Sequence, residues 1–393
     1  MAAVPPVHAD GPFAAFLADL RALGVDRVDS GGIGYGMLGA SSNERWWLVP
    51  MASKKTACAG LAMLQPITVR TRLAKTGAGV LLRCGVGGFA LRKRLFLSGL
   101  PERLADVDPG MRSVAYFTGT AGPHRKTALQ MMDANGRILG YAKLSRDPHV
   151  RPHLRNEAEM LERVARLRLR STDIPAVLRH ADLGGASLLV TDSARARCFR
   201  VPKRFDPPHH AFLRELALAT GSKGAARVLD DLTALVVSVE AGLPALWRAR
   251  FARGAEALRP VISDMPVCMA HGDFTPWNCF VQNARLYVFD WEYARQAYPM
   301  GYDFVHFHLS SPATRTTAFT PSDLAAKLSK FAFEGEERQA RRAVLLSLLL
   351  HAAFYIERSV QAGGTGTDWE QCAFRGDLID AALDRGGNWC NTL

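Results

Sequence analysis

Between residues 111 and 192 strand-like stretches alternate with turns around a single helical stretch, and this pattern limits the folds open to the chain. SVAYFTG, TALQMMD and ILGYAKL have the composition of strands, and ANGR forms a tight hairpin turn because Asn-Gly accepts positive φ. The helical stretch HLRNEAEMLERVARLRL follows, and AVLRHAD and ASLLVTD are two further strands. We expect residues 111–192 to form a small antiparallel β lobe with one key helix.

The sequence after residue 193 is mostly helical. HHAFLRELALAT, LDDLTALVVSVEAGLPALWRARF and DLAAKLSKFAF surround one β-like island, CFVQNARLYVFD. The apolar run at 343–356 is shorter than the roughly 20 residues of a membrane span, so it predicts a buried helix and no transmembrane segment. We expect residues 193–393 to form a larger, mainly helical lobe, which makes the whole chain an α+β protein.

Residues 1–110 carry weaker signals, and we treat them as an N-terminal extension of unknown role. They open with a helical stretch, FAAFLADLRALG, followed by a β-like RWWLVPM, and we expect no signal peptide. GYGMLG, residues 34–39, matches the GxGxxG pattern of dinucleotide-binding loops. It lacks the strand-to-helix context and the later acidic residue of such sites, so we expect a flexible loop there.

The net charge of +12 lies almost entirely in the first half of the chain. Residues 1–192 contain 26 Lys and Arg against 16 Asp and Glu, whereas residues 193–393 contain 23 against 21. The excess is spread out and no nucleic-acid-binding motif accompanies it, so we expect no nucleic-acid partner. A solvated basic surface is favoured, and a surface for an anionic partner is the alternative.

The cysteines bear on the cellular compartment. Seven cysteines, an odd number with no CxxC pair, predict reduced thiols in a cytoplasmic protein.

The stretch MAHGDFTPWNCF, residues 269–280, carries the clearest chemical signal. Asp273 and Asn278 lie in a loop that enters a strand, and Asp290 ends the next strand. Two adjacent strands would bring the three side chains to one edge. Asp and Asn oxygens are the hard ligands that Mg²⁺ prefers, and a free carboxylate can orient a hydroxyl nucleophile. An ordinary turn before a hairpin is the alternative, and His271 fits a structural residue that supports the loop under either interpretation.

A Lys–Glu pair is predicted in the β lobe. Lys143 is the single charged residue in an apolar strand, where an ammonium is costly without a partner. On the following helix Glu157 lies beside the apolar stripe, whereas Glu159 points to the opposite face. We therefore expect Glu157 to pair with Lys143, which could then bind nucleotide phosphates; a solvent-exposed Lys and a surface Glu are the alternative.

The stretch TGTAGPHRK contains two glycines between the first two strands of the lobe. At Gly119 and Gly122 backbone N–H groups could approach phosphates without obstruction by a Cβ atom. A plain hairpin turn is the alternative.

Taken together, HGDFTPWN, LYVFDWEYA, GYAKL and NEAEML resemble the aminoglycoside phosphotransferase and choline/ethanolamine kinase family, over about residues 111–360. The resemblance implies a protein-kinase-like two-lobe fold, with ATP and Mg²⁺ as cofactors. It implies that Asp273 is the catalytic base, that Asn278 and Asp290 are the Mg²⁺ ligands, and that Lys143 binds phosphate beside Glu157. The stretch TGTAGPHRK takes the place of the phosphate loop.

The function that this resemblance implies is ATP- and Mg²⁺-dependent phosphotransfer to a hydroxyl of a small molecule such as a sugar or amino alcohol. The absence of DFG and APE motifs argues against a protein substrate. The near-neutral second half of the chain argues against a polycationic antibiotic as acceptor, because a pocket for a polycation should be acidic. A non-catalytic nucleotide-binding or scaffold protein, docking through its basic N-terminal region, is the alternative.

Overall fold

The computed structural model describes residues 11–40, 45–64, 69–87, 91, 93–120, 122–193, 199–202, 204–311 and 319–383. The chain divides into two compact units. The N-terminal unit consists of residues 1–158 and 175–193, and the C-terminal unit consists of residues 159–174 and 194–393. Helix α6 (Arg151–Leu167) contributes to both, because the division falls within it.

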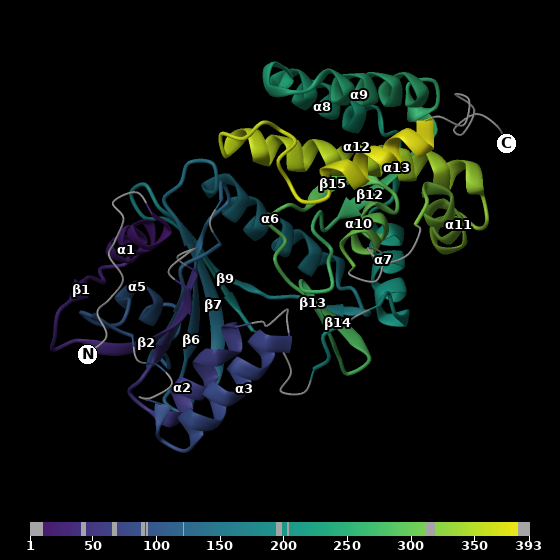
Figure 1. The fold of residues 1–393 in the computed structure, drawn as a ribbon. Helices are drawn as coiled ribbons and strands as arrows, with labels where there is room; N and C mark the ends of the chain where they lie inside the picture. The colour runs from purple at the N-terminus through teal and green to yellow at the C-terminus, as the bar shows by residue number, and fades with distance from the viewer. Residues whose placement is uncertain are drawn as a thin grey trace. The chain divides into compact units, whose positions relative to one another are not determined.

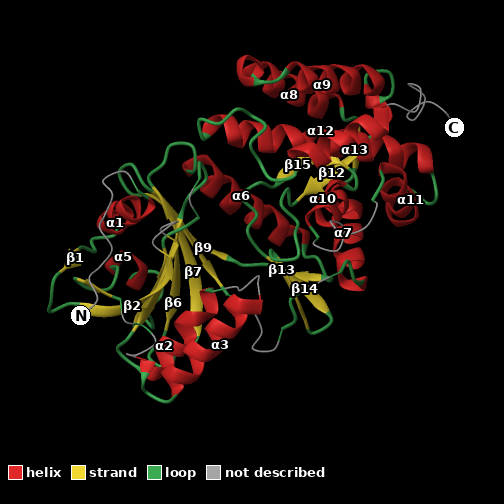
Figure 2. Ribbon diagram, viewed as in Figure 1, coloured by secondary structure: helices red, strands yellow, loops and turns green. Residues whose placement is uncertain are grey.

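The N-terminal unit is built on one antiparallel sheet of nine strands in the order β1-β4-β2-β3-β5-β6-β7-β10-β9 (Figures 1 and 2). Its strands are β1 (Arg27–Val28), β2 (Ile33–Ala40), β3 (Arg45–Pro50), β4 (Arg94–Leu97), β5 (Ser113–Phe117), β6 (Thr127–Met132), β7 (Ile138–Ser145), β9 (Val177–Asp182) and β10 (Ser187–Asp192). Its helices besides α6 include α1 (Pro12–Ala22), α2 (Lys54–Gly60), α3 (Val69–Arg83) and α5 (Glu102–Ala105). The five strands and the helix expected in residues 111–192 are all present.

The boundary that we placed at residue 110 does not separate two compact units. Strand β3 pairs with β5, so strands from both sides of residue 110 share one sheet and one hydrophobic core. The rings of Tyr35 and Tyr116 lie 5.3 Å apart within that core. The Trp46 backbone N–H also donates to Thr118 Oγ1 at 2.9 Å. Residues 11–110 are therefore part of the β lobe and do not form a separate extension.

The GYGMLG stretch forms strand β2, so our expectation of a flexible loop was wrong. Tyr35 and Met37 alternate with glycines and are buried in the core, which is the period-2 pattern of a strand. Gly36 is required by close packing, because a Cβ there would lie 2.6 Å from the Leu91 side chain.

The C-terminal unit is mainly helical, as expected, and its elements are visible in Figure 2. Its longer helices are α7 (Pro207–Thr220), α8 (Ala226–Ser238), α9 (Ala245–Leu258), α10 (Tyr302–Ser310), α11 (Pro321–Ala332), α12 (Glu337–Gln361) and α13 (Cys372–Leu383). One small sheet has the order β11 (Ser222–Lys223), β12 (Pro266–Ala270), β15 (Arg295–Pro299), and the other has the order β13 (Cys279–Gln282), β14 (Arg285–Val288), β8 (Thr172–Asp173).

Helix α12 is the central element of this unit. It contacts α8, α9, α10, α11 and α13. It is long and apolar enough to pass a length-and-composition test for a membrane span, but 67% of its most apolar window is buried inside the protein. That burial is typical of the core helix of a globular unit, which is how the sequence was interpreted.

Two buried histidines of the C-terminal unit predict a loss of stability in mild acid. Burial lowers the pKa of His209 to about 4 and lowers that of His351 well below its usual value. The unfolded chain, with histidine pKa values near 6.5, therefore binds more protons than the folded chain between these limits. We expect the free energy of unfolding to be highest above pH 6.5 and to fall as the pH is lowered toward 4.

The variant His351→Leu separates this effect from the titration of carboxylates. Neither ring nitrogen of His351 has a hydrogen-bond partner among the described residues. Removing the ring should raise the unfolding free energy at pH 7 by about 1 kcal/mol and flatten its decline between pH 6.5 and 5. Denaturant titrations at several pH values measure both effects, and parallel curves for wild type and variant would refute the assignment.

Candidate functional site

The loop that carries Asp273 is held by a buried carboxylate. Strand β12 ends at Ala270, and Asp303, in the first turn of α10, accepts hydrogen bonds from the backbone N–H of His271 at 2.7 Å and of Gly272 at 3.0 Å. Asp303 is 4% exposed, and burial raises its pKa despite these bonds. Gly272 has a φ of +83°, and a Cβ there would lie 2.1 Å from the Tyr293 carbonyl oxygen. The local backbone therefore requires glycine before Asp273.

The Asp273 carboxylate is oriented by two side chains. Asn278 Nδ2 donates to Asp273 Oδ2 at 2.8 Å and to its backbone carbonyl at 2.9 Å. His306 Nε2 lies 2.9 Å from Asp273 Oδ1. The His306 side chain is 1% exposed and that of Asp273 is 27% exposed. The carboxylate is therefore fixed from behind and open to a ligand in front, which suits a group that orients a nucleophile.

His306 was not identified from the sequence. It follows Asp303 by three residues on α10, so the YDFVHF stretch that positions the loop also supplies a contact to Asp273. The ring of His351 lies 4.7 Å behind that of His306. The sequence does place a histidine one turn after Asp303, near the start of a helix. That spacing alone does not predict a contact with Asp273, because the contact requires α10 to lie behind the loop.

The β13–β14 hairpin brings Asp290 to the same loop, as the sequence predicted. Asn283 and Ala284 both have positive φ values, +50° and +60°, which is the pattern of a type I′ turn. Beyond β14, the Phe289 N–H donates to the Asn278 carbonyl at 3.2 Å and the Phe289 carbonyl lies 2.9 Å from His271 Nε2. Asp290 follows directly, with a φ of +70° that is uncommon for a residue other than glycine.

His271 has the structural role expected of it. It is fully buried, and its Nδ1 atom accepts a hydrogen bond from the Asp273 backbone N–H at 3.3 Å. The imidazole therefore joins the loop to the end of β14.

The oxygen atoms at this place are chemically suited to a hard divalent cation. The amide nitrogen of Asn278 makes both bonds to Asp273, so Oδ1 is the Asn278 atom suited to ligation. Carboxylate oxygens of Asp290 and Glu292 lie within 4.8 Å of each other, and Glu292 is 5% exposed. Two carboxylates this close favour a shared cation. Glu292 was also missed from the sequence, although it lies in the DWE stretch.

In the N-terminal unit, Lys143 and Glu157 form the pair that the sequence predicted. The Lys143 ammonium on β7 lies 2.6 Å from both carboxylate oxygens of Glu157 on α6. Glu157 is 3% exposed, whereas Glu159 faces solvent. The apolar stripe of the helix therefore predicted correctly that Glu157, and not Glu159, pairs with Lys143.

The loop between β5 and β6 contains both candidate glycines. Gly119 has a φ of +89°, and a Cβ there would lie 2.4 Å from the Lys126 carbonyl oxygen, so this position requires glycine. Gly122 has a φ of +139° and open space around it. Arg125, from the same loop, forms a 3.0 Å ion pair with the buried Asp19 of α1. The first helix of the chain thus anchors this loop.

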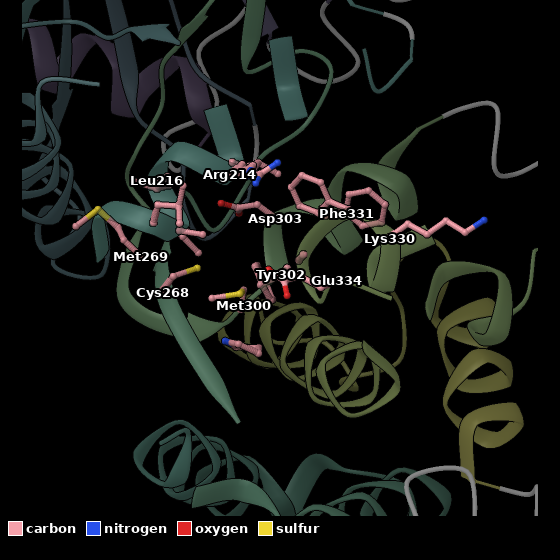
Figure 3. A pocket seen from close by; sticks show the side chains of 18 residues that line it. Arg214, Leu216, Cys268, Met269, Met300, Tyr302, Asp303, Lys330, Phe331 and Glu334 are labelled. Atoms are coloured by element: carbon pink, nitrogen blue, oxygen red, sulfur yellow. The ribbon is translucent and has the colours of Figure 1, made fainter. Parts of the chain in front are cut away.

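A separate pocket of about 280 Å³ lies in the C-terminal unit, and Figure 3 shows its side chains. It is lined by parts of α7, β12, α10 and α11, including Leu216, Met269, Phe304 and Phe331. One of its lining residues, Asp303, also accepts the hydrogen bonds from the loop that carries Asp273. Asp273, Asn278 and Asp290 do not line it, so it is distinct from the candidate catalytic group.

Comparisons with known proteins find matches to this chain by family and by fold. A family model described as a phosphotransferase enzyme family matches residues 141–343, just over half of the 393 residues. A thermostable mutant of aminoglycoside phosphotransferase APH(4)-Ia, in ternary complex with AMP-PNP and hygromycin B, matches with a TM-score of 0.52 and 14% identity, covering 72% of this chain and 97% of that chain. The ternary complex with ADP and hygromycin B matches with a TM-score of 0.50 and 14% identity, covering 72% and 98%. No curated protein sequence matches significantly.

These matches confirm the predicted fold class. The α+β architecture, with its antiparallel sheet and its mainly helical C-terminal part, is protein-kinase-like.

The role of Asp303 predicts a large cost for its removal. Asp303→Ala leaves two buried backbone N–H groups without their acceptor, and we expect the unfolding free energy to fall by about 2–4 kcal/mol. Asp303→Asn should lose less, because its amide oxygen still accepts one of the two bonds. The matched control is Asp377→Ala, an exposed Asp on α13, with a change within about 0.5 kcal/mol. Thermal denaturation measures the stability of the three variants, which we expect to fall from Asp377→Ala to Asp303→Asn to Asp303→Ala. Equal effects of the two alanine variants would contradict this order.

Proposed function

This chain belongs to the phosphotransferase enzyme family, and from that premise we propose that it transfers the γ-phosphate of ATP to a hydroxyl of a small molecule, with Mg²⁺ as cofactor. The observation that carries the proposal is the partly exposed Asp273 carboxylate, fixed by Asn278 and His306 in a loop that Asp303 pins. Phosphoryl transfer requires little covalent chemistry from the protein beyond such positioning.

Asp273 acts as the base in this proposal. It accepts the hydrogen bond of the acceptor hydroxyl and orients its oxygen in line with the γ-phosphorus. A bond forms between that oxygen and phosphorus, the bond to the β–γ bridging oxygen breaks, and ADP leaves. The proton of the hydroxyl passes to the Asp273 carboxylate. His306 and Asn278 hold the two carboxylate oxygens through this step.

The metal would be held by Asn278 and Asp290, with Glu292 beside them. The close pair of carboxylates and the available amide oxygen fit a hard cation. When bound, Mg²⁺ neutralises the negative charge of the phosphates and of the transition state.

Nucleotide binding by the N-terminal unit is proposed to rest on Lys143 and on the β5–β6 loop. Glu157 holds the Lys143 ammonium in place, from which it can pair with phosphate oxygens. Backbone N–H groups at Gly119 and Gly122 are available to the phosphates because no Cβ stands over them. The complexes of APH(4)-Ia with AMP-PNP and ADP support a nucleotide as the donor.

The acceptor is proposed to be a sugar, an amino alcohol or a related metabolite. Residues 193–393 carry 23 Lys and Arg against 21 Asp and Glu, a balance that does not favour a polycationic acceptor. Hygromycin B is bound by the APH(4)-Ia relative, so aminoglycosides belong in the test panel. A cytoplasmic location remains a prediction from the odd number of cysteines and the lack of a CxxC pair.

Removing the base tests the mechanism directly. We expect Asp273→Ala to lower kcat by at least about 10³-fold, because the acceptor hydroxyl loses its orienting group, while the Kd for the ATP analogue changes less than about threefold. A panel of small alcohols assayed by transfer of labelled phosphate measures turnover, and calorimetry measures nucleotide binding. Normal turnover would refute the role of Asp273. ATP binding by the wild type, with no turnover of any acceptor, would favour the scaffold alternative.

His306 is predicted to be a positioning residue. His306→Leu removes the bond to Asp273 Oδ1 and should lower kcat by about 10–100-fold with little change in the KM for ATP. His306→Gln keeps a side-chain donor and should recover part of that loss. A purely packing role would make Gln no better than Leu, and that outcome would remove His306 from the mechanism.

A further inference from the structure

The segment between Glu44 and Glu102 is basic throughout. Residues 45–101 contain ten Lys and Arg and no Asp or Glu. The segment lies outside residues 141–343, which the phosphotransferase family model matches. A charge bias this complete over 57 residues implies a positive surface whose purpose the proposed phosphotransfer does not explain.

Helix α3, within this segment, has apolar side chains on two opposite faces. Ala78 and Leu82 face inward and pack in a small core with Val49, Ala57, Leu61 and Leu91. Leu73, Val80 and Leu81 face solvent and are 68%, 50% and 38% exposed, and Val86 just beyond the helix is 40% exposed. The spacing of Leu73 and Val80, seven residues, places them on one stripe of the helix. The outer stripe therefore holds several exposed apolar side chains and not a single one.

Cationic side chains lie beside this stripe. Arg72 and Arg83 of α3 are exposed, and the helix carries no acidic residue. Lys54 begins α2, which packs against α3 (Figure 1), and its side chain is exposed. The Lys54 ammonium reaches the chain just after α3, since a Cβ at Gly85 would lie 2.7 Å from its Nζ atom. The apolar stripe therefore has cations around it.

We propose that the α2–α3 surface, formed by Lys54, Arg72, Leu73, Val80, Leu81, Arg83 and Val86, binds the surface of an anionic lipid bilayer. Aliphatic side chains can enter the boundary between headgroups and acyl chains while Lys and Arg attract anionic headgroups, which is how interfacial helices bind. The inference is independent of the proposed phosphotransfer.

Two other occupants fit the surface less well. A second copy of the chain, docked through the same face, would place the two positive surfaces against each other. Nucleic acid would use the cations, but stacking on bases requires aromatic side chains, and the exposed apolar residues here are aliphatic. A bilayer uses both the charge and the aliphatic stripe.

Vesicle co-sedimentation of the full chain tests the proposal. We expect binding to vesicles of phosphatidylcholine and phosphatidylglycerol, little binding to phosphatidylcholine alone, and weakening by salt. Leu73→Ser with Val80→Ser should weaken binding at least about tenfold. Arg72→Gln with Arg83→Gln should weaken it about 30-fold on anionic vesicles. The control is Val237→Ser, which changes a 63% exposed residue on α8 and should leave binding unchanged.

Several outcomes would overturn the proposal. These are no binding to anionic vesicles at low salt, equal loss in the Val237→Ser control, and retained binding in both double variants. Binding to duplex DNA or RNA without vesicle binding would assign the cations to nucleic acid. A concentration-dependent dimer that Leu73→Ser disrupts, again without vesicle binding, would assign the stripe to a second copy. All the substituted residues are exposed, and an unchanged thermal denaturation midpoint shows that each variant is folded.

Discussion

The buried Asp303 carboxylate is the constraint on which the candidate catalytic group depends. It accepts the backbone N–H groups of His271 and Gly272, so the chain must turn at a fixed place just before Asp273. Because Asp303 lies in the first turn of α10, the same helix presents His306 to the Asp273 carboxylate one turn later. Helix α10 therefore contributes both to the path of the loop and to the orientation of the proposed base, which Asn278 also holds.

Much of this arrangement could be predicted because its signals are local. The Asn-Gly turn, the strand-like composition of β6 and β7 and the apolar stripe of α6 each depend on neighbouring residues, and together they placed Lys143 opposite Glu157 correctly. The hairpin from β13 to β14 is equally local. It was sufficient to bring Asp290 to the loop of Asp273 and Asn278.

The rest depends on contacts between residues far apart in the chain. Strands β1–β4 join the sheet through the pairing of β3 with β5, and the hydrogen bond from Trp46 of β3 to Thr118, just after β5, spans 72 residues. In GYGMLG the alternation of Tyr35 and Met37 with glycines was a local strand signal, but the close approach of Leu91 to Gly36 joins residues 55 positions apart and has no local signal. His306 contacts Asp273 across 33 residues, and no periodicity encodes that pairing.

We propose that Asp290 and Asn278 hold a divalent cation together with a nucleotide. Electron paramagnetic resonance of Mn²⁺, titrated against the protein with AMP-PNP present, measures that binding directly. We expect saturable Mn²⁺ binding to the wild type, weakened at least about tenfold in Asp290→Asn because one anionic ligand is lost. Equal Mn²⁺ affinity in wild type and variant, under conditions where both bind the nucleotide, would contradict it.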